Sequence, residues 1–257
     1  GRLTSFLLKL VFLEKNWVFW VIYPLILTII WPFSVLFVSL LTGQFTFFKG
    51  YLSRVGSKLL GKATPIHIAI FASGAGSNAR KIIEYFENND RIKVSLLVCN
   101  VPGAGVLEIA KEKGIPTLLI NKTEFATNGY VQSLRNADIH FIVLAGFLWK
   151  VPAVLVKAFE KGVGNAKGII NIHPALLPNY GGKGMYGAKV HEAIIAAGEK
   201  KSGITIHWVD AHYDEGDIIF QAECGINETD TPSSVADKIH ILEHAHFAPT
   251  IEKILLK

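Results

Sequence analysis

Three side chains near the ends of expected strands carry the groups that acyl-transfer chemistry needs. Asn171 and His173 lie two residues apart, and Asp214 follows in a later polar segment. Alternation along a strand places Asn171 and His173 on the same side of a sheet. An amide can steady a developing oxyanion, an imidazole can move a proton, and a nearby carboxylate raises the pKa of that imidazole. The pattern predicts acid–base chemistry; the alternative is a hydrogen-bonded strand end for His173 and a turn for Asp214.

A glycine-rich turn before an expected helix is typical of a phosphate site. Residues 73–79 (SGAGSNA) follow an apolar strand, so backbone N–H groups and the helix N-terminus would face an anion. The spacing matches GxGxxA, but the second strand ends in residues 98–100 (VCN) instead of the acid that holds a dinucleotide ribose. We therefore predict a monophosphate ligand. The alternative is a tight turn made by Gly74 and Gly76, with Ser77 capping the helix.

Several histidines and acids raise the question of a metal site. His207, His212 and Asp214 are close in the sequence, yet they show neither HxH nor HExxH spacing. His240 and His244 lie one turn apart on an expected helix without a third ligand near them in the sequence. The chain also has two cysteines and no CxxC pair, which argues against structural zinc. We expect no metal ion, and surface or interface positions for His240 and His244.

Short apolar runs alternate with amphipathic stretches after residue 65 and predict the elements that hold these side chains. This alternation is typical of βαβ units around a parallel sheet. Open α/β sheets bind ligands at the carboxyl ends of their strands, where the glycine-rich turn, Asn171 and His173 fall. We therefore predict an α/β fold with a mostly parallel, doubly wound, Rossmann-like sheet. Strands are expected at 66–72, 93–98, 117–120, 139–145, 168–172, 203–209 and 217–222, and helices near 78–88, 104–113, 125–136, 152–161, 188–198 and 233–256.

The net positive charge of the chain comes from its first quarter. The 257 residues carry a formal net charge of +5. Residues 1–62 hold seven basic side chains and one acid, which leaves 19 basic and 20 acidic side chains in residues 63–257. A nucleic-acid-binding protein should carry its positive patch on the folded domain. Nucleic acid is therefore not an expected partner.

An uncharged apolar run within residues 1–62 predicts a membrane-associated segment. The run covers about residues 17–42, which exceeds the roughly 20 apolar residues that cross a bilayer core. Pro24 and Pro32 leave open whether it forms a kinked transmembrane helix or a hairpin. Four basic residues follow the run and three precede it, a bias that predicts a cytoplasmic domain tethered to the inner face of the membrane. A signal peptide is the alternative, but the run is too long and no A-x-A site follows it.

Several motifs occur in order after the apolar run. They are SGxGSN (73–78), LAGFL (144–148), NIHPxLLP (171–178), GITIHxVD (203–210), DEG (214–216) and LEH (242–244). Over about residues 66–256 this set resembles the glycinamide ribonucleotide formyltransferase family of purine synthesis. The resemblance implies the formyltransferase fold for a catalytic domain at 63–257. It also implies transfer of a formyl group from the co-substrate 10-formyltetrahydrofolate to the amine of glycinamide ribonucleotide, on the route to IMP.

The resemblance further implies a role for each matching residue. Asn171 would steady the tetrahedral oxyanion, His173 would be the general acid or stabilising cation, and Asp214 would raise the pKa of His173 and relay protons through water. Substrate contacts would come from Gly76, Ser77 and Asn78 at the phosphate and from Glu243 near the glycinamide end. The folate site would be lined by Leu148, Trp149, Lys150, Val151, Asn171, Asp210, Ala211, His212, Tyr213 and Asp214.

Other functions remain as alternatives. Formyltetrahydrofolate hydrolase usually has NIHHSFLP where this chain has NIHPALLP, and methionyl-tRNA formyltransferase has an additional carboxyl-terminal domain. A membrane-tethered binding module without catalysis is a third alternative, against which the complete set of Asn171, His173 and Asp214 argues. We expect a monomer or a homodimer that binds small-molecule substrates.

Overall fold

The computed structural model describes residues 30–39, 52, 64–164 and 166–257, and the chain divides into two compact units, Gly1–Thr64 and Pro65–Lys257. In the first unit, residues 30–39 form a helix. The rest of the expected apolar span 17–42 lies outside the described residues. Among the residues that are described, no helix is both long and apolar enough to cross a membrane.

The second unit is built on a seven-stranded mixed sheet with the order β3-β2-β1-β4-β5-β6-β7. The first five strands in this order pair in parallel, while β6 pairs antiparallel with β5 and β7 antiparallel with β6. The chain reverses its direction of travel across the sheet between β1 and β4, which is where open α/β folds bind ligands. The strands are β1 Ile66–Ala72, β2 Ile92–Cys99, β3 Thr117–Leu119, β4 Phe141–Leu144, β5 Ile169–His173, β6 Lys201–Trp208 and β7 Ile218–Gly225.

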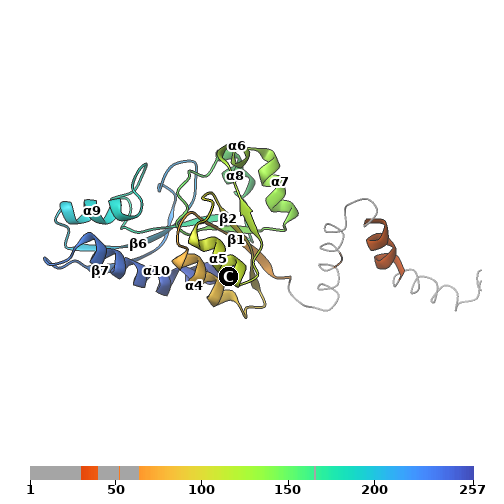
Figure 1. Cartoon of the computed structure of the whole chain (residues 1–257), viewed down its shortest axis with the longest axis horizontal. Coiled ribbons are helices and arrows are strands. Elements are labelled where there is room, and N and C mark those ends of the chain that lie inside the picture. Colours follow the sequence, from red (N-terminus) through yellow and green to blue (C-terminus); the bar gives the residue numbers. More distant parts are fainter. Residues whose placement is uncertain (1–29, 40–51, 53–63, 165) are drawn as a thin grey trace, which may run out of the picture. The chain divides into compact units, whose positions relative to one another are not determined.

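Helices cover both faces of this sheet because buried strands alternate their side chains between two apolar cores. In β1, Ile68 and Ile70 join the core under α4, α5, α9 and α10, whereas Ala69 and Phe71 join the core under α6, α7 and α8. In Figure 1, α6, α7 and α8 lie on one side of the sheet and α4 and α10 on the other. The helices are α4 Ser77–Phe86, α5 Gly105–Glu112, α6 Lys122–Phe125, α7 Asn128–Asn136, α8 Ala153–Ala158, α9 Ala188–Ala196 and α10 Pro232–Leu255.

The predicted α/β fold is confirmed, and one expected helix is wrong. Residues 125–136 form the end of α6 and the whole of α7 instead of one continuous helix. The side chain of Asn121 accepts a hydrogen bond from the amide of Glu124, and that of Thr127 accepts one from the amide of Tyr130. Each of these side chains caps a separate helix N-terminus, which explains the break.

Candidate active site

The glycine-rich turn joins β1 to α4 and leaves the N-terminus of that helix open. Gly76 occupies the N-cap position with φ +83°, and within the described part of the chain no side chain caps the helix. The alternative in which Ser77 is the cap is therefore wrong, because Ser77 is the first residue of the helix. Uncapped N–H groups at a helix N-terminus form a ready site for a phosphate.

Only glycine fits at the N-cap of α4. A Cβ atom on Gly76 would lie 2.6 Å from Cγ2 of Val106, and the positive φ disfavours any L side chain. Ser73, at the start of the same turn, donates a hydrogen bond to Oδ1 of Asn100 at 2.5 Å and accepts one from the amide of Leu148 at 2.9 Å. These two bonds tie the turn to the segments that follow β2 and β4.

Antiparallel pairing of β5 with β6 brings His207 beside Asn171. The two residues are register partners, and Nδ2 of Asn171 lies 3.1 Å from Nε2 of His207. Nδ1 of His207 lies 2.9 Å from the carbonyl oxygen of Trp208, which can only accept, so in the neutral ring Nδ1 carries the proton and Nε2 accepts from Asn171. His207 thereby fixes the direction of the Asn171 amide and leaves its second N–H for another acceptor.

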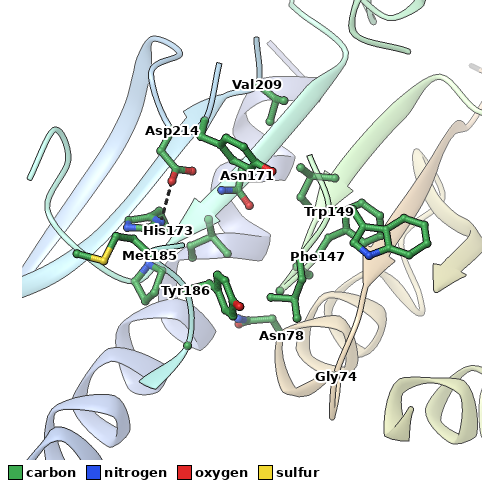
Figure 2. A pocket seen from close by; sticks show the side chains of 18 of the residues that line it. Gly74, Asn78, Phe147, Trp149, Asn171, His173, Met185, Tyr186, Val209 and Asp214 are labelled. Carbon is green, nitrogen blue, oxygen red and sulfur yellow. Dashed lines mark ion pairs between the residues drawn. The ribbon is translucent and has the colours of Figure 1, made fainter. Parts of the chain in front are cut away.

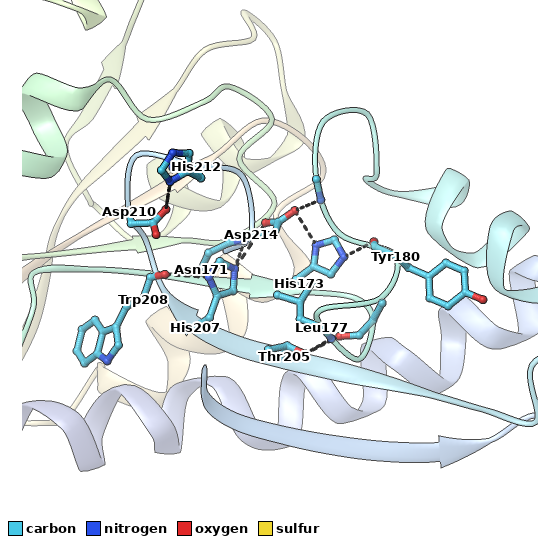
Figure 3. Close-up of polar contacts among 12 residues, drawn as sticks. Asn171, His173, Leu177, Tyr180, Thr205, His207, Trp208, Asp210, His212 and Asp214 are labelled. Carbon is cyan, nitrogen blue, oxygen red and sulfur yellow. Dashed lines mark hydrogen bonds and ion pairs between the residues drawn. The ribbon is translucent and has the colours of Figure 1, made fainter. Parts of the chain in front are cut away.

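His173 is held between a carboxylate and a backbone carbonyl (Figure 3). Its Nε2 lies 2.8 Å from the carbonyl oxygen of Tyr180, and its Nδ1 lies 3.6 Å from Oδ2 of Asp214. The other carboxylate oxygen of Asp214 lies 3.6 Å from Nε2 of His207, and the amide of Gly182 donates to Asp214 at 2.9 Å. The residues expected to move a proton are therefore brought together, with Asp214 between two imidazoles.

Burial and the neighbouring groups together shift the pKa values of His173 and Asp214. Desolvation lowers the pKa of His173 below its usual value, and this outweighs the rise that the Asp214 charge and the Tyr180 carbonyl cause. Asp214 thus raises the pKa of His173 as expected, but burial, which the sequence does not reveal, makes the net shift a lowering. Burial acts to raise the pKa of Asp214 as well, but the neighbouring His207, His173 and Gly182 amide lower it overall.

A second buried acid lies beside the glycine-rich turn. Glu243 on α10 is 6% exposed, and its Oε2 accepts a hydrogen bond from Nδ2 of Asn78 at 2.9 Å. Desolvation raises the pKa of Glu243, against the opposing effects of Asn78 and His240. Oδ1 of Asn78 is buried without a hydrogen-bond partner among the described residues. A buried acceptor of this kind favours a ligand that brings a donor.

One pocket of about 690 Å³ connects these groups. Figure 2 shows His173 and Asp214 toward one end of it and Gly74 and Asn78 toward the other. All expected site residues line the pocket except Ala211, which is exposed in the same loop as its neighbours. The lining residues from the expected set are Gly76, Ser77, Asn78, Leu148, Trp149, Lys150, Val151, Asn171, His173, Asp210, His212, Tyr213, Asp214 and Glu243.

Aromatic and cationic side chains shape the wall between β4 and α8. The Trp149 ring packs against Phe147 and Phe125 with ring centroids 6.3 and 6.1 Å away. The ammonium of Lys150 lies 5.4 Å above the Tyr213 ring, on the opposite loop. Phe147, Trp149 and Lys150 line the pocket, so this wall offers aromatic side chains with a positive charge beside them, which suits an aromatic, anionic ligand.

His207 is the main site residue that the sequence reasoning missed. It belongs to the GITIHxVD motif, but its contact with Asn171 arises from the β5–β6 pairing, which spacing along the chain does not reveal. His191, on α9, also lines the pocket, is 4% exposed, and was not expected there. Within the described residues, no group of three or more His, Cys, Asp or Glu could hold a metal ion.

Comparison with known proteins assigns the class. The formyl transferase family matches residues 66–251, and the chain belongs to this family. It is 36% identical over 194 residues to the phosphoribosylglycinamide formyltransferase of Bacillus subtilis, covering 73% of this chain and 93% of that protein. It is 39% identical over 193 residues to the chloroplastic phosphoribosylglycinamide formyltransferase of Vigna unguiculata, covering 73% of this chain and 60% of that protein. The resemblance inferred from the motifs is confirmed.

A solved structure agrees with the fold. The crystal structure of the phosphoribosylglycinamide formyltransferase from Bacillus halodurans is similar with a TM-score of 0.66 and 36% identity, covering 74% of this chain and 96% of that chain. This chain matches less than two thirds of the length of the two plant proteins, 60% for the one from Vigna unguiculata and 64% for the one from Arabidopsis thaliana. It spans nearly all of the bacterial ones.

Proposed function

We propose that this chain transfers a formyl group from 10-formyltetrahydrofolate to the amine of glycinamide ribonucleotide, in purine biosynthesis. The observation that carries the proposal is the location of Asn171, His173 and Asp214 in one pocket with an open phosphate-binding turn. The formyl donor must reach Asn171, His173 and Asp214 while the phosphate of the formyl acceptor binds at the glycine-rich turn. The relatives named above, which are phosphoribosylglycinamide formyltransferases, support this choice of substrates.

In the proposed reaction, the substrate amine attacks the formyl carbon and a tetrahedral intermediate forms. Asn171 donates its free N–H to the oxyanion, since its other N–H is directed to His207. The C–N bond to N10 of the folate then breaks, and the proton lost by the amine is delivered to N10. His173 and Asp214 carry that proton, helped by water, and the products are the formylated amine and tetrahydrofolate.

The two ends of the pocket suit the two substrates. The N–H groups of Gly76, Ser77 and Asn78 would hold the phosphate, and Glu243 would accept hydrogen bonds from the hydroxyl or glycinamide groups. The reduced folate would lie along residues 148–151 and 210–214, against the aromatic wall defined above. These roles are consistent with the burial of Glu243 and with the position of Lys150 over Tyr213.

We also propose that residues 1–62 attach this catalytic unit to a membrane, with the unit on the cytoplasmic side. The support is the uncharged apolar run at 17–42 and its basic flanks. Within the helix at 30–39, Ile30, Phe33 and Phe37 are 51%, 70% and 65% exposed. Large apolar side chains that are exposed together on one helix favour an apolar surrounding.

A growth test addresses the proposed reaction. We expect the chain to restore growth without purines to a bacterium that lacks glycinamide ribonucleotide formyltransferase activity, and the His173→Ala variant to fail at equal expression. Failure of the unaltered, expressed chain to restore growth, or equal rescue by the variant, would count against the proposal.

A further inference from the structure

Residues 180–182 contact both members of the proposed proton-transfer pair through backbone atoms. The carbonyl of Tyr180 accepts from Nε2 of His173 at 2.8 Å, and the amide of Gly182 donates to Oδ2 of Asp214 at 2.9 Å. The loop that begins here also carries Gly184 and Gly187, both with positive φ. A shift of this short segment would therefore change the surroundings of His173 and Asp214 together.

The Tyr180 carbonyl decides which nitrogen of His173 titrates. A carbonyl oxygen accepts only, so Nε2 of His173 keeps its proton in the neutral ring. Nδ1 is then the nitrogen that gains and loses a proton, and it lies 3.6 Å from the Asp214 carboxylate. This choice of tautomer depends on the place of one backbone oxygen.

The backbone of the segment is held in an unusual conformation. Tyr180 has φ +59°, which is uncommon for a residue other than glycine. A Cβ atom on Gly181 would lie 2.6 Å from Leu177 and 3.2 Å from Cβ of Asp214, so the segment is packed directly against the acid. A strained residue keeps such a conformation only when surrounding contacts fix it.

The side chain of Tyr180 makes one such contact, away from the pocket. Its hydroxyl donates to Oε1 of Glu199 at 2.7 Å, in the turn that links α9 to β6. The ring packs on the core formed by α4, α5, α9 and α10. Neither the Tyr180 hydroxyl nor Glu199 lies among the residues that line the pocket.

We propose that the hydrogen bond between Tyr180 and Glu199 anchors residues 180–182, and that both side chains are positioning residues for the His173–Asp214 pair. The inference rests on the proposed formyl transfer for its kinetic consequences and on the geometry alone for its effect on His173. Tyr180 acts through its carbonyl, and Glu199 acts through Tyr180.

Loss of the hydrogen bond between Tyr180 and Glu199 should change the pKa of His173 in a defined direction. The charged or titratable groups that face His173 are Asp214 from the β6–β7 loop, His207 from β6 and His191 from α9. The Tyr180 carbonyl and Asp214 raise the pKa of His173, whereas burial and His207 lower it. A displaced carbonyl therefore lowers the pKa of His173 further.

The test compares Tyr180→Phe with Tyr85→Phe in the full chain. Tyr85 is a matched control because its hydroxyl donates to Oε2 of Glu252, also at 2.7 Å, and it lies outside the pocket. For Tyr180→Phe we expect kcat to fall about 3- to 10-fold, the factor that corresponds to the net free energy of one hydrogen bond. Both KM values should stay unchanged. In the protein without substrates, the NMR titration of His173 should move to lower pH. Tyr85→Phe should change neither.

Each outcome decides a separate question. A Tyr180→Phe protein with the wild-type kcat and the wild-type titration of His173 overturns the inference. If that variant does not fold, Glu199→Ala is measured in the same two ways and decides instead. If the unaltered chain does not transfer formyl groups, the proposed function fails, while the NMR titration still tests the anchor.

Discussion

His173 is 3% exposed, and its proton affinity depends more on burial than on its acidic neighbour. A buried imidazole with a lowered pKa is neutral in the free protein near neutral pH. A proton that reaches Nδ1 is then stabilised by Asp214 and, on the other side of the ring, by the Tyr180 carbonyl. This arrangement suits a group that takes up a proton during the reaction and gives it away again.

At this scale, the charge of Asp214 can be removed without changing the shape of the side chain. In Asp214→Asn the carboxylate no longer raises the pKa of His173, so that pKa falls further. We expect kcat to fall at least ~100-fold and the limb of the pH–rate profile that reports His173 to move to lower pH. The measurement is the pH dependence of kcat and kcat/KM.

Asp217→Asn is the control for this change, because Asp217 is an exposed partner of Lys167 in the same connection between β6 and β7. It should leave the pH profile as it is. A wild-type rate in Asp214→Asn, or a profile that moves to higher pH, contradicts the proposed role.

At the scale of elements, the turn between β1 and α4 depends on a glycine at one position. Gly76→Ala should lower the free energy of unfolding by about 1–3 kcal/mol, because the alanine needs a disfavoured φ and contacts Val106. It should also raise the KM for glycinamide ribonucleotide, since the first N–H groups of α4 would shift. Denaturant unfolding and steady-state kinetics measure the two effects.

Gly74→Ala is the matched control for stability in the same turn. A Cβ atom on Gly74 meets nothing within 4 Å among the described residues, and the backbone φ there is not positive. Its unfolding free energy should stay near that of the unaltered chain. Equal losses in Gly74→Ala and Gly76→Ala would mean that the turn does not depend on the conformation of Gly76.

The elements that the sequence predicted well are those whose signal is local. The apolar runs gave the strands that hold Asn171 and His173, and the glycine-rich turn follows β1 as expected. The sequence pattern does not predict the break between α6 and α7, because only the structure shows that the side chain of Thr127 caps α7. The contact of His207 with Asn171 depends on antiparallel register, and the lowered pKa of His173 depends on burial. Neither can be derived from spacing along the chain.

At the scale of the whole molecule, a basic segment that contains an uncharged apolar run and a nearly neutral domain are joined in one chain. The second unit, Pro65–Lys257, has its own two cores and corresponds in extent to nearly the whole of the bacterial relatives. The first unit has no counterpart in the family match, which begins at residue 66. The proposed chemistry and the proposed membrane attachment therefore belong to separate parts.

Membrane attachment can be tested without any enzyme assay. When membranes from cells that express the full chain are washed in alkaline carbonate, we expect the chain to stay in the pellet, because an apolar span of this length is not displaced by high pH. The unit Pro65–Lys257, expressed alone, is the control and should appear in the supernatant. Release of the full chain into the supernatant would contradict a membrane-spanning segment.

The most direct test of the account is the rate of formyl transfer by the purified unit Pro65–Lys257. With 10-formyltetrahydrofolate present, we predict formation of tetrahydrofolate and formylated product only when glycinamide ribonucleotide is added, and a rate at least ~100-fold lower for His173→Ala. Release of formate at the same rate without glycinamide ribonucleotide, or no reaction at all in a folded protein, would contradict the account.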